Sequence, residues 1–194
     1  MKFGVILADP PWSYSHKTPV GSMGGCTYPT MSAGELASLP IERIAKPDCA
    51  LFMWATFPKL WEAMVLMDAW GFTYRTTCFV WVKTNRKSEG IYSGMGRWTN
   101  GNAEVVLFGR RGRPIRKNKD VKQIVMAPRG IHSAKPPEVH GRIERLIVDS
   151  DRLELFARVR RPGWTCLGRD LSGNSIADDL ANLETVHQNR DVAA

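Results

Sequence analysis

The chain of 194 residues carries a formal net charge of +8, and 43% of its residues are apolar, enough for one sizeable hydrophobic core. No apolar stretch approaches the roughly 18 residues that a membrane span needs, and we expect no signal peptide. The four cysteines and four histidines are widely separated, which speaks against a zinc site and predicts reduced thiols. We therefore expect a cytoplasmic protein without a membrane anchor or a metal.

The first apolar run, Phe3 to Ala8, stops at Asp9-Pro10-Pro11-Trp12. Such a run predicts a buried strand, and open α/β sheets bind ligands beyond the carboxyl ends of their strands. Proline has no N–H, so this loop offers carbonyl acceptors without competing donors, and an ionised Asp9 is also acceptor-only. Acceptors beside an indole suit a planar base with an exocyclic amine, which would bind Asp9 and the Pro10 carbonyl and stack on Trp12.

Two interpretations of this loop remain open. In the catalytic one, the acceptors draw the amine nitrogen toward a tetrahedral shape, which frees its lone pair, and Asp9 stabilises the positive charge that develops. In the structural one, the four residues form only a rigid turn with a core tryptophan. Adenine and cytosine both carry a suitable amine.

The later elements alternate between helix and strand. Ser32 followed by Glu35 is a capping box that predicts a short helix ending near Pro40. Apolar runs predict strands at 50–55, 76–83, 103–108, 122–127, 152–157 and 164–167. Helical spacing predicts helices over 59–70, from Pro136-Pro137 onward, and over 176–186 with Ser175 as the cap. The alternation predicts a mostly parallel sheet with helices on both faces.

Basic residues gather in the middle of the chain. Between Lys83 and Arg129, twelve lysines and arginines stand against three acids, so the remainder is close to neutral. Phosphate contacts are the usual role of such a cluster, and aromatic residues within it could stack on bases. The alternative is a solvated basic surface without a partner. Candidate substrate contacts are Lys83, Arg97 and Trp98, together with Tyr28 beside the glycines at 21–25.

An acidic residue in a late strand could serve a cofactor. Glu154 follows Leu153 in a short apolar run, with no helical partner to explain it, and Arg158 comes just after the run. A carboxylate near a strand end can accept hydrogen bonds from both hydroxyls of a ribose. The alternative is a structural ion pair between Glu154 and Arg158.

Several strings carry a resemblance that runs from Val5 to about Gly173. They are Ala8-Asp9-Pro10-Pro11-Trp12, Tyr28-Pro29-Thr30-Met31-Ser32, Leu51-Phe52-Met53-Trp54, Trp81-Val82-Lys83-Thr84-Asn85, Lys135-Pro136 with Glu144-Arg145, Leu153-Glu154-Leu155-Phe156-Ala157-Arg158, and Gly163-Trp164 with Leu167-Gly168. In this order they resemble the family of the catalytic subunit of the messenger-RNA adenosine methyltransferase, which also contains small bacterial and phage DNA adenine methyltransferases.

The resemblance implies a Rossmann-like α/β fold that uses S-adenosylmethionine, with the amine-binding motif preceding the cofactor motif. It implies that Glu154 and Arg158 hold the cofactor's ribose and that Lys135 contacts its methionine carboxylate. After Leu167-Gly168 the family usually has Asn and a polar residue. Arg169 and Asp170 stand there in this chain, so we expect cofactor contacts of different reach and charge.

These observations predict one methyltransferase domain over 1–175 with a basic target-binding insertion at about 84–130, followed by a C-terminal helix and tail over 176–194. The predicted reaction methylates the N6 amine of adenine, with DNA preferred over RNA because the chain is similar to the bacterial and phage members. An RNA adenine methyltransferase and a non-catalytic partner subunit are the alternatives. A nucleic acid is the expected partner, and a homodimer or a partner subunit is left open.

Overall fold

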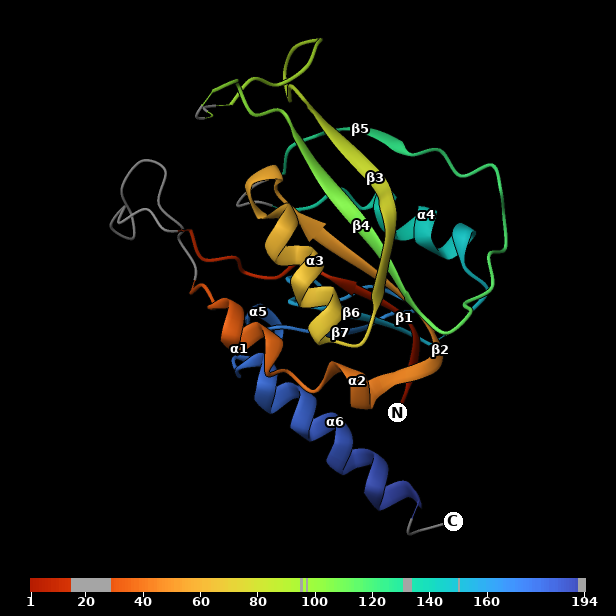
Figure 1. Ribbon diagram of the computed structural model, residues 1–194. Coiled ribbons are helices and arrows are strands. Elements are labelled where there is room, and N and C mark those ends of the chain that lie inside the picture. The colour runs from red at the N-terminus through yellow and green to blue at the C-terminus, as the bar shows by residue number, and fades with distance from the viewer. Residues whose placement is uncertain (15–28, 95, 97, 131–133, 150, 192–194) are drawn as a thin grey trace.

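One sheet organises the residues that the computed structural model describes, which are 1–14, 29–94, 96, 98–130, 134–149 and 151–191 (Figure 1). The elements in chain order are β1 (Phe3–Ala8), α1 (Ala33–Ala37), α2 (Ile41–Ile44), β2 (Ala45–Ala55), the 3-10 helix η1 (Phe57–Lys59), α3 (Leu60–Ala69), β3 (Thr73–Thr84), β4 (Ala103–Arg111), β5 (Ile124–Pro128), α4 (Glu138–Leu146), β6 (Arg152–Leu155), β7 (Thr165–Leu167), α5 (Arg169–Ser172) and α6 (Ile176–Asp191).

The sheet is mostly parallel, as predicted. Its strand order is β5-β3-β4-β2-β1-β6-β7. β1 pairs in parallel with β2 and β6, β6 pairs in parallel with β7, and β3 does so with β5. Only β4 runs antiparallel to its neighbours. The carboxyl ends of the other strands therefore share one edge of the sheet with the beginning of β4.

Alternating side chains of the central strands divide the core into two layers. Phe3 and Ile6 of β1 pack in one cluster with buried residues of α1, α2, α3 and α6. Val5 and Leu7 of the same strand pack in the other cluster, which includes Val139 of α4. Figure 1 shows α3 and α4 on opposite sides of the sheet. The prediction of helices on both faces is confirmed.

Local signals placed several helix starts correctly. The Ser32 hydroxyl accepts a hydrogen bond from the Glu35 N–H, and the Glu35 carboxylate accepts one from the Ser32 N–H, which completes the predicted capping box. The Ser175 hydroxyl likewise accepts a hydrogen bond from the Asp178 N–H at the start of α6. α2, η1 and α5 were not predicted, because helices of three or four residues show no periodicity in the sequence. In the described part of the chain, no helix is long and apolar enough to cross a membrane.

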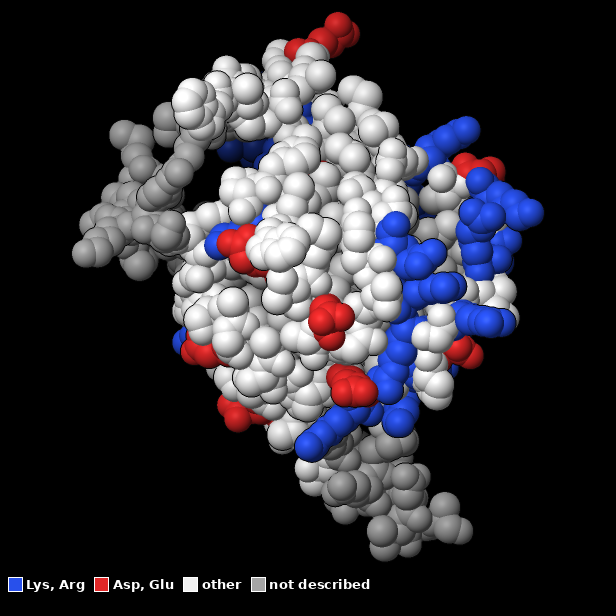
Figure 2. Space-filling model, in the orientation of Figure 1, with Lys and Arg blue, Asp and Glu red and all other residues white. Residues whose placement is uncertain are grey.

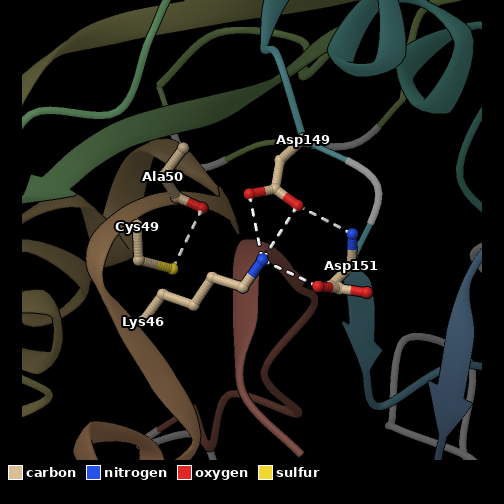
Figure 3. A network of polar contacts seen from close by, with 5 residues as sticks. All are labelled: Lys46, Cys49, Ala50, Asp149 and Asp151. Atoms are coloured by element: carbon tan, nitrogen blue, oxygen red, sulfur yellow. Dashed lines mark hydrogen bonds and ion pairs between the residues drawn. The ribbon is translucent and has the colours of Figure 1, made fainter.

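β2 begins at Ala45, five residues before the predicted strand, and polar contacts explain the difference. Lys46 Nζ lies 3.2 Å from Asp149 Oδ2 and 2.7 Å from Asp151 Oδ2 (Figure 3). Both acids precede β6, so these ion pairs hold the beginnings of β2 and β6 on either side of β1. The Asp149 carboxylate also occupies the space that a Cβ on Gly4 would need. Ion pairs, and not an apolar pattern, thus extend the strand.

The predicted target-binding insertion at about 84–130 contains two strands of the sheet. β4 and β5 lie within it, where strands were predicted at 103–108 and 122–127, and its role in target binding stays a prediction. The rest of this region is the loop at 85–102 between β3 and β4 and the loop at 112–123 between β4 and β5. Because β4 separates them, the two loops leave the sheet at opposite ends of this strand.

Candidate active site

Residues that follow three parallel strands meet at one edge of the sheet. Asp9 follows β1, Phe156 follows the neighbouring β6, and Gly168 follows β7. The chain leaves β1 for β2 on one side, whereas β6 pairs with β1 on the other. Such a reversal of strand order opens a crevice at the carboxyl ends of the strands, where open α/β sheets bind their ligands.

A cavity of about 100 Å³ lies at this point, and we call it the strand-end cavity. It is lined by Asp9, Pro10, Pro11, Pro29, Phe156, Ala157, Arg158, Arg169 and Asp170. The donor-poor loop after β1 therefore shares this cavity with two arginines and a second aspartate. Guanidinium groups bind carboxylates, and carboxylates accept hydrogen bonds from hydroxyl and amino groups.

Backbone geometry shapes the wall of the strand-end cavity. Phe156 has a φ of 64°, in the left-handed region that residues other than glycine rarely adopt. This conformation ends β6 at Leu155, two residues before the predicted strand end. A Cβ on Gly168 would overlap the backbone of Ala157, so glycine allows the end of β7 to approach the turn after β6 this closely.

Asp9 and three other charged side chains form a network. Lys135 Nζ lies 2.9 Å from Asp9 Oδ2 and 3.3 Å from Glu104 Oε2. Lys83 Nζ lies 2.7 Å from the other carboxylate oxygen of Glu104. The four side chains are between 14% and 29% exposed. The network thus pairs two carboxylates with two ammonium groups in a partly desolvated setting.

Charge and burial shift the pKa values of Asp9 and Glu104 in opposite directions. Burial raises the pKa of Asp9 above its ordinary value, against the opposing effect of the Lys135 ammonium group. Burial alone would also raise the pKa of Glu104, but the charges of Lys135 and Lys83 together hold it below the ordinary range. Glu104 is therefore the more firmly ionised member of the pair.

A second and larger cavity, of about 430 Å³, lies on the other side of this network, and we call it the hairpin cavity. It is lined by Tyr14, Thr56, Phe57, Pro58, Lys83, Tyr92, Gly94, Gly96, Gly101, Ala103, Glu104 and Arg129. The guanidinium group of Arg129 lies over the Tyr92 ring, 4.2 Å from its centroid. The network links the two cavities, because Asp9 lines one and Glu104 lines the other.

Comparison of the sequence with known proteins identifies the family of this chain. A model of the MT-A70 family matches residues 3–170. The chain is 34% identical to the type II methyltransferase M.MunI of Mycoplasma sp., over 90% of this chain and 80% of that protein. The chain belongs to the MT-A70 family. It is also 33% identical to the N(6)-adenosine-methyltransferase MT-A70-like protein of Drosophila melanogaster and to the human N(6)-adenosine-methyltransferase catalytic subunit METTL3, over 91% of this chain but only 28% and 30% of those longer proteins.

Membership of the MT-A70 family confirms the resemblance that the motifs indicated. It also confirms a Rossmann-like methyltransferase fold and an enzyme that depends on S-adenosylmethionine. The roles assigned to single residues stay predictions. For those residues the structure supplies their positions and contacts.

The strand-end cavity unites six of the predicted site residues, which are Asp9, Pro10, Pro11, Arg158, Arg169 and Asp170. The last two open α5, a helix that the sequence did not predict. The Pro10 carbonyl already accepts a hydrogen bond from the Trp12 N–H at 2.8 Å, which leaves it one further lone pair. The predicted amine-binding motif thus lies beside part of the predicted cofactor motif, although about 145 residues separate them in the sequence.

The Trp12 side chain is buried, whereas stacking on a base would need an exposed face of the indole ring. Its side chain packs in the core, and the residue is only 7% exposed. Its indole N–H donates to the Trp54 carbonyl at 3.3 Å. This position agrees with the structural interpretation of a core tryptophan, and an open stacking face would require the indole to move.

Two predicted cofactor residues have protein partners. Glu154 was expected to lack a helical partner, and this is wrong: His140 Nε2 of α4 lies 2.9 Å from Glu154 Oε2, with Arg161 Nε at 3.9 Å. The alternating pattern of β6 explains the contact, because Glu154 points to the opposite face from Leu153 and Leu155 and so toward α4. Lys135, predicted to contact the methionine carboxylate, lies between Asp9 and Glu104. Both cofactor roles stay predictions.

The predicted substrate residues fall into three groups. Lys83 lies in the network and lines the hairpin cavity. Trp98 is 98% exposed in the loop between β3 and β4, and its role stays a prediction. Tyr28 and Arg97, like the glycines at 21–25, lie outside the described residues.

Sequence reasoning missed Glu104 and His140 as site residues. Glu104 counted only as one of three acids in a basic region, although an acid within the apolar run at 103–108 was a usable signal. His140 was one of four scattered histidines, and nothing in the sequence linked it to Glu154. Within the ranges that the structure describes, no three His, Cys, Asp or Glu side chains gather as metal ligands.

Proposed function

We propose that this protein transfers the methyl group of S-adenosylmethionine to the N6 amine of adenine in DNA. The observation that supports it most directly is the strand-end cavity, where the loop Asp9-Pro10-Pro11 faces Arg158, Arg169 and Asp170. In one place the cavity offers acceptors for an amine and charged groups for a zwitterionic cofactor. The proposal has the enzyme working in the cytoplasm, as the sequence predicts.

The donor set of the cavity suits S-adenosylmethionine. The guanidinium groups of Arg158 and Arg169 are suited to the methionine carboxylate or to ribose hydroxyls, and Asp170 is suited to the hydroxyls. When bound, the cofactor supplies an electrophilic methyl group on a positively charged sulfur. Arg169 and Asp170 stand where relatives usually have Asn and a polar residue. We therefore propose that this chain contacts the cofactor here through side chains of different reach and charge.

Asp9 and the Pro10 carbonyl orient the target amine in this proposal. Lys135 binds the Oδ2 oxygen of Asp9, and we assign the amine contact to Oδ1 and to the free lone pair of the Pro10 carbonyl. The bound cofactor would supply its methyl group to the adenine nitrogen, which Asp9 and the Pro10 carbonyl would hold in position, and the nitrogen would lose one proton to water. Holding the reacting atoms in line can supply about 7 to 11 kcal/mol of the barrier, and Asp9 stabilises the charge on nitrogen.

In this proposal the target adenine is unstacked from the duplex when it enters the site. An enzyme that modifies an exocyclic amine inside a pocket must flip the base out or bind a single strand. The hairpin cavity adjoins the network through Lys83 and Glu104, and Tyr92 and Arg129 also line it. We assign the nucleotides that flank the target to this cavity.

DNA is the preferred substrate because of the relative that this chain matches along most of its length. That relative is the type II methyltransferase M.MunI, of which the chain covers 80%. RNA is the second candidate, favoured by 33% identity to N(6)-adenosine-methyltransferases. A non-catalytic partner subunit is disfavoured because Asp9, Pro10 and the charged groups opposite them are all present.

Methyl incorporation into matched substrates tests this proposal. We expect the purified protein to methylate adenine in duplex DNA at least about tenfold faster than in an RNA of the same sequence at equal salt, since affinity for either polyanion depends steeply on salt. Nucleoside mass spectrometry identifies the product as N6-methyladenine. A clear preference for RNA would overturn the choice of DNA, and a methylated cytosine would overturn the choice of base.

A further inference from the structure

The loop between β4 and β5 carries a dense run of positive charge far from the strand-end cavity. Residues 110–122 contain seven lysines and arginines and one acid, Asp120. Six of the cations are exposed: Arg110, Arg113, Arg116, Lys117, Lys119 and Lys122. Figure 2 shows lysines and arginines gathered in a band along the side of the molecule where Figure 1 places this loop. We call these six residues the distal basic surface.

The acids nearby do not neutralise this surface. Asp120 pairs with Arg145 at 2.8 Å, and Glu42 pairs with Arg111 at 3.4 Å, so each of these acids already has a cation outside the six. The Asp48 carboxylate accepts a hydrogen bond from the Arg113 backbone N–H. In the parts of the chain that the structure covers, no carboxylate forms an ion pair with any of the six cations.

The course of β4 separates this surface from the active site. Glu104 stands at the active-site end of β4, and Arg110 stands near the other end, opposite Ala50 of β2 and Thr73 of β3. Six residue steps at about 3.4 Å each put roughly 20 Å between their Cα atoms. B-DNA rises about 3.4 Å per base pair, so this span equals about six base pairs.

The chain itself connects the two regions. From the distal basic surface it runs into β5, the edge strand of the sheet, and on to Arg129, which lines the hairpin cavity. Ile124 and Met126 along this edge are 48% and 63% exposed. The Arg142 side chain of α4 donates to the Ile124 carbonyl at 2.7 Å. Backbone contacts keep the loop in place: the Lys117 N–H donates to the Leu146 carbonyl at 2.7 Å, and the Val148 N–H donates to the Ile115 carbonyl at 3.0 Å.

We propose that the distal basic surface is a second DNA contact, which binds duplex phosphates about six base pairs or more from the flipped adenine. It would add affinity without reading sequence, because contacts to phosphates position a protein on the duplex but carry no base information. This inference rests on the proposed DNA substrate. It divides the basic region predicted from sequence into a part beside the target base and a part that holds the flanking duplex.

Binding of fluorescent duplexes tests the inference without requiring methyl transfer. The test variant is Arg116→Gln with Lys119→Gln, and the control is Lys2→Gln with Arg160→Gln, which removes the same charge from exposed positions outside the surface. Two duplexes, each with the target adenine at its centre, are titrated over a series of salt concentrations. The duplex of about 8 base pairs leaves only about four base pairs on either side of the adenine, which is too few to reach the distal basic surface, and the duplex of about 24 base pairs reaches it.

We expect wild type and control to bind the long duplex at least about tenfold tighter than the short one. The test variant should lose most of this difference, and its slope of log affinity against log salt should fall by about 2, since each phosphate contact contributes about 0.9. Equal behaviour of the test and control variants on both duplexes would overturn the inference. Absence of adenine methylation by wild type would instead refute the proposed function, so the two failures are distinguishable.

Discussion

Replacing Asp9 with alanine is expected to lower the rate of adenine methylation by at least about 100-fold, the usual cost of losing a preorganised group at a developing charge. The carboxylate lies in the strand-end cavity at the end of a rigid, buried strand, and Lys135 holds one of its oxygens 2.9 Å away. Without it, the amine keeps only the Pro10 carbonyl. Initial rates of methyl incorporation into DNA measure the effect.

Binding of the cofactor is the control for this variant. S-adenosylmethionine at 100 times its dissociation constant should stabilise both wild type and Asp9→Ala by about 2.7 kcal/mol. An unchanged shift in melting temperature together with a lost rate assigns Asp9 to the amine. A variant that turns over within about tenfold of wild type would refute the role, because a single neutral hydrogen bond would account for so small a change.

The pH dependence of the rate follows from the raised pKa of Asp9. Because burial lifts this pKa, the carboxyl takes up a proton at a higher pH than an ordinary aspartate, and the rate should fall there on acidification. A carboxyl whose pKa is higher in the folded state stabilises the protein at low pH, and that contribution is lost as the pH rises through the folded value. Asp9→Asn should therefore not lower the melting temperature at neutral pH. A clear fall would contradict this assignment.

Replacing Glu104 with alanine is expected to lower the free energy of unfolding by about 3 kcal/mol, because it leaves two partly buried ammonium groups without their shared carboxylate. Lys83 would lose the partner that lies 2.7 Å away, and Lys135 would keep only Asp9. Urea unfolding measures the loss. Glu104→Gln keeps the shape of the side chain and an acceptor oxygen. Its free energy of unfolding should therefore lie between those of wild type and Glu104→Ala.

A surface ion pair supplies the matched control. Glu62 of α3 pairs with Lys59 at the end of η1 at 2.9 Å, and the Glu62 side chain is 38% exposed. Glu62→Ala should lower the free energy of unfolding by less than about 1 kcal/mol. The pKa of Glu104 is lowered, so its contribution is present above the ordinary glutamate pKa and is lost as the pH falls through the lower folded value. If Glu104→Ala and Glu62→Ala lower the free energy of unfolding by the same amount, the Glu104 ion pairs behave like a surface ion pair, and the prediction is contradicted.

The two predictions are coupled through charge. Glu104 raises the pKa of Asp9, because a nearby negative charge disfavours a second one. Removing that charge in Glu104→Gln should move the acidic fall of the methylation rate to lower pH. A purely structural role of Glu104 would leave this pH profile in place.

Local patterns in the sequence predicted the elements whose signals are local. The apolar run from Phe3 to Ala8, the capping box of Ser32 and Glu35, and the amphipathic helix after Pro137 all form as expected. The start of β2 was missed because Lys46 pairs with acids more than 100 residues away. Pairings of that kind depend on the fold and leave no periodicity in the sequence.

Site residues that belong to a sequence motif could be predicted. Site residues that only the arrangement of the sheet brings together could not. Asp9 and Arg158 were candidates from their positions at strand ends, and one cavity holds both. Glu104 joins them only because β4 is antiparallel and begins where the other strands end, which the sequence did not reveal. The burial of Trp12 also depends on tertiary packing, since an indole after a proline pair can face either the core or solvent.

A crystal structure of the protein with an adenine-containing oligonucleotide tests the central claim most directly. We predict that the N6 nitrogen lies within hydrogen-bonding distance of Asp9 Oδ1 and the Pro10 carbonyl oxygen, in the strand-end cavity. An adenine bound elsewhere, with this corner of the cavity closed to the base, would contradict the account.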